Sequence, residues 1–229
     1  MIYIPIVSAL ITMLLFYVFL YKMDYIERAA ATGAETEKKM YTRKQSVILS
    51  AGYFILTIIM CYFLYLYTMS DEANHTEPFL YCKIVVANLI TGCAALTDAK
   101  RSKIPNFLII FGLISRVMIY VAEFVFRRDS FLYILEYDGL GFAIGFLFLF
   151  VIAIITKGGI GYGDVKLFGV IGLLMSGSGV FSVLFLSLLL SSIVSIVMIA
   201  IKKKSIKSSL PMAPFIYAAT FLVSTVGIF

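Results

Sequence analysis

The chain has 229 residues, of which 62% are hydrophobic and 14% are charged, with a mean hydropathy of +1.01 and a net charge of +6. These values exclude an ordinary soluble globular domain and indicate an all-α, polytopic integral membrane helical bundle. The positive charge does not indicate nucleic-acid binding, because the basic residues fall in short loops between apolar segments, where they report membrane topology.

About eight apolar segments are predicted to be transmembrane helices. The first, residues 1–21, has the length of a signal peptide but no basic n-region, so we interpret it as a retained helix. A loop at 127–137 is expected before the fifth helix, and a turn at 177–179 between the sixth and seventh. We expect residues 1–78 to form an N-terminal unit of two helices with a short cytosolic loop, and residues 79–229 a six-helix catalytic core. The predicted helices are 1–21, 46–69, 79–97, 107–126, 139–156, 164–175, 180–201 and 211–229.

The loops differ strongly in positive charge, which predicts their side of the membrane. Loops 22–45, 98–103, 157–166 and 202–207 hold fifteen of the nineteen Lys and Arg residues. Because cytoplasmic loops carry the excess of positive charge, we expect these four inside and both termini outside, in a cytoplasmic (inner) membrane. The third helix then ends, and the sixth begins, at the cytoplasmic edge.

The fourth predicted helix carries Arg116 and Glu123, seven residues apart on one face. Two interpretations remain open here: a structural ion pair, or separate contacts to neighbouring helices. Both are favoured over a catalytic role, because no motif surrounds these residues.

The cysteine and histidine content indicates no metal site. Cys61, Cys82 and Cys93 form no CxxC pair, so we expect small buried hydrophobic residues rather than zinc ligands or a disulfide. His75 is the only histidine. We therefore expect no metal and no cofactor.

Residues 158–166 read Gly-Gly-Ile-Gly-Tyr-Gly-Asp-Val-Lys, which places a carboxylate at the mouth of a hydrophobic helix. A charge in the hydrocarbon region costs roughly 2.5–3.5 kcal/mol on insertion scales, so Asp164 is a candidate functional residue. The glycines permit positive φ or a close approach of another backbone, and they predict an unwound, adaptable entry to this short helix. The hinge candidates are Gly158, Gly159, Gly161 and Gly163.

Asp98 ends the third predicted helix on the same side as Asp164, so the topology allows the two carboxylates to meet. Each residue alone has a structural explanation, Asp98 beside basic neighbours and Asp164 as a helix N-cap. Together they favour the aspartic-protease arrangement, in which close like charges leave the pair holding one proton. One aspartate then activates water while the other polarises the scissile carbonyl.

Three segments of the sequence resemble the type IV prepilin peptidases. Gly161-Tyr162-Gly163-Asp164 matches the GxGD signature of intramembrane aspartic proteases, and its wider context is similar to that of the prepilin peptidases. Asp98 followed by Ile104-Pro105-Asn106 is similar to the family's other catalytic segment. Pro211-Met212-Ala213-Pro214-Phe215 is similar to its proline-containing final helix.

The resemblance implies a membrane aspartic endopeptidase that removes the short basic leader from pilin-like precursors at the cytoplasmic face. It implies Asp98 and Asp164 as catalytic residues, with the precursor and the lipid bilayer as partners. Members that also methylate the product carry a larger domain, often with CxxC motifs, between their first two helices. Here loop 22–45 is short and has no cysteine, so we expect a peptidase-only form. The supporting residues implied are Lys166, Pro105, Asn106, Pro211 and Pro214.

Three alternatives stay open. A presenilin-like protease shares GxGD, but its terminal motif is Pro-Ala-Leu where this chain has Pro211-Met212-Ala213. A proton-coupled transporter would use intramembrane acids and broken helices, usually in two matching halves, and only one such break is evident. A structural assembly subunit would tolerate replacement of both aspartates.

Overall fold

A computed structural model describes residues 10–20, 43–70, 78–156, 159–201 and 210–226, and within these ranges the elements are helical. Five of the described helices are long and apolar enough to cross a membrane. The prediction of an all-α, multi-pass bundle is therefore confirmed. The elements are the short helix Leu10–Leu20, α2 (Arg43–Ser70), α3 (Pro78–Arg101), α4 (Asn106–Phe126), η1 (Arg128–Ser130), α5 (Phe131–Phe142), η2 (Ala143–Phe148, a π-helix), α6 (Leu149–Ile155), α7 (Tyr162–Ala200) and α8 (Ala213–Val226).

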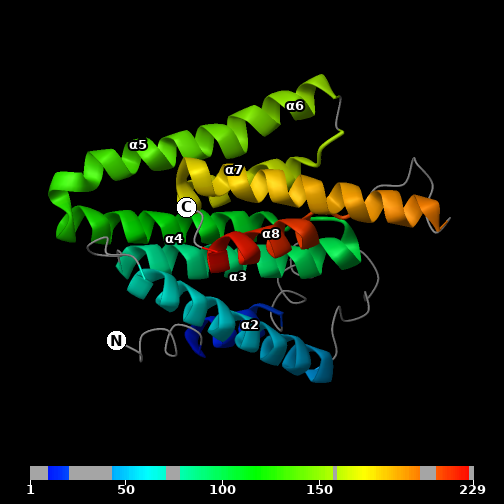
Figure 1. Ribbon diagram of the computed structural model, residues 1–229, viewed down its shortest axis with the longest axis horizontal. Helices are drawn as coiled ribbons and strands as arrows, with labels where there is room; N and C mark the ends of the chain where they lie inside the picture. The colour runs from blue at the N-terminus through cyan, green and yellow to red at the C-terminus, as the bar shows by residue number, and fades with distance from the viewer. Residues whose placement is uncertain (1–9, 21–42, 71–77, 157–158, 202–209, 227–229) are drawn as a thin grey trace, which may run out of the picture.

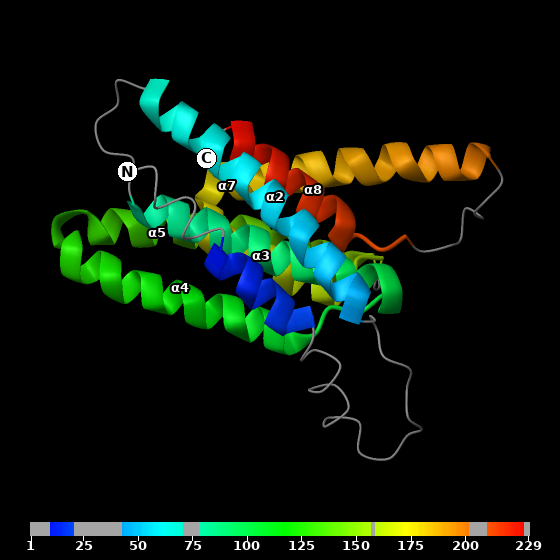
Figure 2. The ribbon, with the colours of Figure 1, turned by 90° about the horizontal axis from the view of Figure 1, so that it is seen from below.

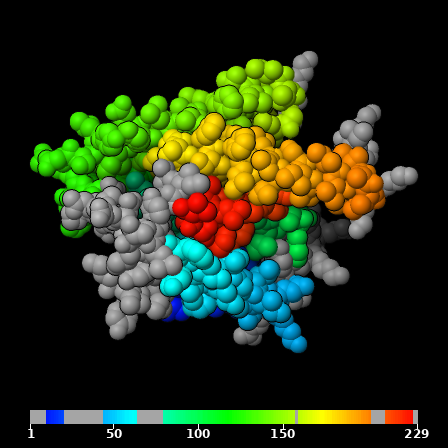
Figure 3. Space-filling model, in the orientation of Figure 1, coloured from blue at the N-terminus to red at the C-terminus, as the bar shows by residue number. Residues whose placement is uncertain are grey.

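Helix α7 is the centre of the bundle, because it packs against α3, α4, α5, η2, α6 and α8. Helix α2 lies outside this group against α8 and α3 (Figures 1 and 2). Figure 3 shows short α8 on one face, flanked by α7 and α2. The domain boundary predicted at residue 78 stays a prediction. So does the location of both termini on the external side of the membrane, since residues 1–9 and 227–229 lie outside the described residues.

Helix α7 turns back on itself at Ser176, the one residue within it that has non-helical dihedral angles (φ 59°, ψ −169°). Gly145 lies against both Phe168 and Val180. These two residues would be about 18 Å apart along a straight helix. The two halves of α7 therefore run side by side, as Figures 1 and 2 show. The predicted division into a sixth and a seventh segment is correct, but the turn lies at Ser176 and not at 177–179, which are helical.

The loop predicted at 127–137 is wrong, because the chain is helical from Arg128 onward through η1 and α5. The same helix carries Asp138, an acid of a kind that is rare within membrane helices. In the structure its carboxylate is buried, contacts Arg116 and accepts a hydrogen bond from Ser176 Oγ (2.8 Å). A paired charge does not prevent a helix from entering the bundle.

Both interpretations left open for Arg116 and Glu123 hold. Arg116 Nη1 lies 3.0 Å from Glu123 Oε2, and the pair also contacts neighbouring helices within a larger buried cluster. Lys83 Nζ lies 2.9 Å from Glu123 Oε1 and 4.0 Å from Asp138 Oδ2. The Arg116 guanidinium also stacks over the Tyr120 ring, 3.7 Å from its centroid. Two cations therefore balance two anions where α3, α4 and α5 meet. We call Lys83, Arg116, Glu123 and Asp138 the ion cluster.

The three cysteines are free thiols. Cys61 and Cys93 are buried as expected, whereas Cys82 is exposed, which corrects the expectation for that residue.

Helix α5 and η2 approach the first half of α7 through two glycines four residues apart. A Cβ built on Gly141 would lie 2.2 Å from the Gly172 carbonyl oxygen, and one on Gly145 would lie 2.3 Å from that of Phe168. Real side chains do not reach such distances, so these positions require the absence of a Cβ. This is the small-residue packing that lets membrane helices approach closely.

Gly141→Ala and Gly145→Ala are expected to destabilise the bundle by about 1–3 kcal/mol or more, because the obstructing atoms are backbone and cannot rotate away. Thermal unfolding in detergent micelles measures the effect. Gly139→Ala is the matched control on the same helix, since a Cβ at that position would have no atom within 4 Å. An equal response of all three variants would contradict the close approach.

Candidate active site

Asp98 lies in the last turn of α3 and is 7% exposed. Its backbone carbonyl accepts a hydrogen bond from Ser102 N–H at 2.8 Å. Ser102 has φ 51°, the left-handed conformation that commonly ends a helix. The helix thus extends to Arg101, beyond the predicted end at 97, and holds Asp98 on a rigid element.

The Asp98 side chain contacts the beginning of α8. Its Oδ2 accepts a hydrogen bond from the backbone N–H of Ala213, 3.0 Å away. Ala213 is the first residue of α8, so this N–H has no partner within its own helix. Pro211 and Pro214 flank it and fix where α8 begins. This backbone donor was missed by sequence reasoning, although the two prolines mark the helix start.

Asp164 is the third residue of α7 and is half-buried. Its Oδ1 is buried and has no hydrogen-bond partner among the described residues. The Asp98 carboxylate is close enough to act on it electrostatically. The structure therefore brings the two aspartates, from α3 and α7, to one end of the bundle.

The glycines before Asp164 serve close approach rather than an unusual backbone conformation. A Cβ on Gly163 would lie 3.3 Å from Ile104 Cβ, and one on Gly161 would lie 2.9 Å from Asp164 Oδ2. Gly161 has φ −66° and Gly163 is already helical. Among the described residues the non-helical entry is thus 159–161, which includes Gly159, and Gly158 lies outside the described residues.

The turn between α3 and α4 is tied to α7. Lys166 Nζ donates a hydrogen bond to Asn106 Oδ1 at 3.2 Å, and Pro105 stands at the N-cap of α4 with φ −66° and ψ 134°. Together with the Gly163–Ile104 contact, this places the Ile-Pro-Asn segment beside the Gly-rich segment.

Three segments far apart in the sequence therefore meet: the end of α3, the start of α7 and the start of α8. Two carboxylates at such a junction can divide the roles of general base and general acid. Within the described part of the chain, no group of three or more His, Cys, Asp or Glu side chains is arranged to hold a metal ion.

Comparisons with known proteins bear on this junction. Residues 84–199 match the model of the type IV leader peptidase family. The chain is also similar to the prepilin leader peptidase/N-methyltransferase of Bacillus subtilis (strain 168), with 35% identity over 149 residues. The aligned part is 65% of this chain and 56% of that relative, so the chain spans little more than half of the relative's length. No solved structure matches the chain. The family match contains both Asp98 and Asp164.

Proposed function

This chain belongs to the type IV leader peptidase family, and from that premise we propose that it is a membrane endopeptidase that removes the leader of pilin-like precursors, with Asp98 and Asp164 as its catalytic pair. One observation carries the assignment of the site. The two carboxylates come from different helices, lie within electrostatic range and share one end of the bundle with the Ala213 amide.

In the proposed reaction the two aspartates have different roles. Asp98 accepts the Ala213 N–H, which holds its carboxylate in a fixed orientation, and we assign it the role of general base. Asp164, with a buried Oδ1 that has no described donor, carries the shared proton as the general acid.

The bond changes follow from these roles. Asp98 takes a proton from water as the water oxygen attacks the scissile carbonyl carbon, while Asp164 gives its proton to the carbonyl oxygen. The tetrahedral diol collapses when Asp98 gives its proton to the amine nitrogen, the C–N bond breaks, and Asp164 takes back a proton from a diol hydroxyl. The products are the free leader and the mature chain with a new amino terminus.

The side of the membrane follows from the loops. The positively charged loops 98–103 and 157–166 adjoin the two aspartates, which supports an active site at the cytoplasmic face. A precursor whose leader stays in the cytosol would present its scissile bond at this level.

The product amine is proposed to stay unmethylated. Loop 22–45 carries no cysteine and is too short for a separate enzymatic domain, although the named relative is a peptidase/N-methyltransferase.

Co-expression of the chain with a pilin-like precursor tests this function directly. We expect a smaller product on a gel, whose mass corresponds to loss of the leader without an added methyl group. A precursor that keeps its full length beside well-expressed chain would contradict the peptidase, and a methylated product would contradict only the peptidase-only form.

Gly161→Val and Gly163→Val are expected to lower leader cleavage by about 10²-fold, because small displacements of a catalytic group have effects of this size. A side chain at Gly161 would collide with Asp164 Oδ2, and one at Gly163 would press on Ile104. Initial rates at matched expression measure the change. Gly139→Val, at the open position on α5, is the control, and near-normal rates in both glycine variants would refute a positioning role.

A further inference from the structure

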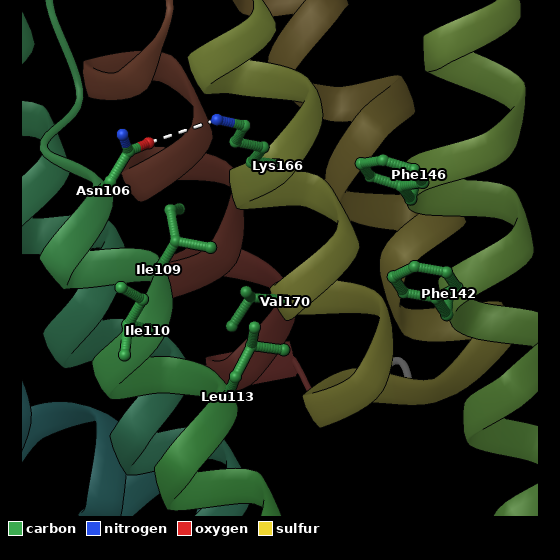
Figure 4. Close-up of a pocket in the computed structure, with 8 residues that line it drawn as sticks. All are labelled: Asn106, Ile109, Ile110, Leu113, Phe142, Phe146, Lys166 and Val170. Atoms are coloured by element: carbon green, nitrogen blue, oxygen red, sulfur yellow. Dashed lines mark hydrogen bonds between the residues drawn. The ribbon is translucent and has the colours of Figure 1, made fainter.

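An apolar groove of about 470 Å³ opens on the outside of the bundle, between α4 and the α5–η2 segment, with the first half of α7 as its floor (Figure 4). Figure 4 shows α4 side chains on one wall and two phenylalanines on the other. We call it the α4–η2 groove. It is lined by Asn106, Ile109, Ile110, Leu113, Phe142, Phe146, Lys166 and Val170.

Two glycines set the depth of this groove. A Cβ on Gly112 would lie 2.6 Å from Val170 Cγ1, so α4 approaches α7 closely there. A Cβ on Gly169 would lie 3.1 Å from Phe146 Cβ, so η2 also approaches α7 closely, from the other side of the groove. Both walls are thus held against α7 while the space between them stays open. A π-helix in one wall is a feature often found at functional sites.

The groove has one polar end, at the level of the candidate active site. The Lys166–Asn106 hydrogen bond crosses this end, as Figure 4 shows. Lys166 lies two residues after Asp164, about 3 Å farther along the helix axis. From Asn106 to Leu113 the groove runs about 10 Å away from that end, the length of two helical turns.

A row of rings connects the groove to the Gly-rich segment. Phe142 stacks on Phe146 with ring centroids 5.1 Å apart, and Phe146 stacks on Phe150 at 5.6 Å. The Phe150 ring lies 6.5 Å from that of Tyr162, within the Gly161–Asp164 motif. The side chains that would contact an occupant of the groove are therefore connected to the start of α7 through successive ring contacts.

We propose that the α4–η2 groove seats the first two turns of the hydrophobic helix of the precursor, an inference that rests on the peptidase function proposed above. The occupant must be apolar and must arrive from within the membrane, because Ile110 is 54% and Leu113 39% exposed on the outside of the bundle. The length of the groove matches two turns of a helix. The polar end of the groove lies at the same level along α7 as Asp164, where the scissile bond must be held.

The path from the groove to the two aspartates fits the reach of a peptide. Asp164 and Lys166 lie on different faces of α7, since two residues correspond to about 200° of rotation. A helix is about 10 Å across, and three or four extended residues span about 10–14 Å. The chain between the scissile bond and the seated helix is therefore extended over the start of α7.

Steady-state cleavage by the full chain in proteoliposomes tests this seat, with two substrates. One is the full precursor, and the other is a short peptide that carries the leader and scissile bond but lacks the hydrophobic helix. Ile110→Trp and Leu113→Trp, which fill the groove from its exposed wall, are expected to raise KM for the precursor by about tenfold or more. We expect kcat for the precursor and both constants for the short peptide to change less than about threefold. Met118→Trp is the control, because Met118 is 68% exposed on the same helix and lies about 12 Å from Ile110 along its axis.

A cross-link between the groove and the precursor gives a readout independent of turnover. Ile110→Cys is expected to form a disulfide with a precursor that carries a cysteine in the first two turns of its helix. The unsubstituted chain, with Cys61, Cys82 and Cys93 only, supplies the background. Absence of this cross-link while the precursor is being cleaved would indicate that lipid occupies the groove, and it would overturn the proposed binding of the precursor helix there.

The outcomes separate the two proposals. Unchanged KM for the precursor in both tryptophan variants would overturn the seat and leave the peptidase function standing. Equal damage to the precursor and the short peptide would also overturn it, because the variants would then act by distorting the aspartate site. Failure of the unsubstituted chain to cleave either substrate would overturn the peptidase function itself.

Discussion

Asp164→Asn and Asp98→Asn are each expected to lower leader cleavage by about 10³-fold or more, without loss of membrane insertion. An amide has the size of the carboxyl group but cannot exchange the proton that the pair must pass between water and substrate. At Asp98 the amide oxygen can still accept the Ala213 N–H, so the start of α8 keeps its contact. Initial rates on the precursor, at matched amounts of chain in the membrane, measure the loss.

The double variant is expected to be no slower than either single variant. The two aspartates act as one unit, so removing either one already removes the catalytic contribution of both. Asp129→Asn is the matched control, since Asp129 is an exposed acid in η1, distant in sequence from both aspartates. Cleavage retained in either single variant would remove that residue from the chemistry.

Arg116→Met is expected to destabilise the bundle by about 3–5 kcal/mol, the usual effect of removing one partner from a buried ion pair. Arg116 is 1% exposed and contacts both Glu123 and Asp138. Without it, Lys83 alone faces two buried carboxylates. The midpoint of thermal unfolding in detergent micelles should fall by several degrees.

A second substitution tests whether the loss of charge balance in the ion cluster is the reason for the lower stability of Arg116→Met. Asp138→Asn removes one negative charge and keeps an oxygen that accepts the Ser176 hydroxyl. In the Arg116→Met background it restores a neutral cluster, so the double variant should lose less than the sum of the two single losses. Arg128→Met is the control for loss of an exposed arginine. Strict additivity of the two single effects would contradict a coupled cluster.

The local pattern of the sequence accounted for most of the fold. Long apolar runs fixed the membrane segments, because a backbone in lipid must satisfy its own hydrogen bonds as helix. The positively charged loops predicted that the third segment ends and the sixth begins at one end of the bundle, and the structure brings Asp98 and Asp164 together there.

The predictions that failed concern segments whose polar groups find partners on helices distant in the sequence. The stretch expected as a loop at 127–137 is helical and continues through Asp138, whose charge is paired by Arg116 of another helix. The turn expected at 177–179 lies at Ser176, a non-glycine residue with φ 59°, whose hydroxyl bonds the same carboxylate. A backbone in this region is unfavourable by about 1–3 kcal/mol unless its surroundings hold it.

The sequence by itself determined the class of the protein, its membrane segments and the two candidate acids, since hydrophobicity, loop charge and motif order are properties of the chain read in one dimension. Only the tertiary structure decided which groups those acids meet. The Ala213 amide, the Lys166–Asn106 bond and the α4–η2 groove each join helices that are far apart in the sequence. Such contacts depend on how closely the helices pack, and that distance is set by glycines whose neighbours no local pattern reveals.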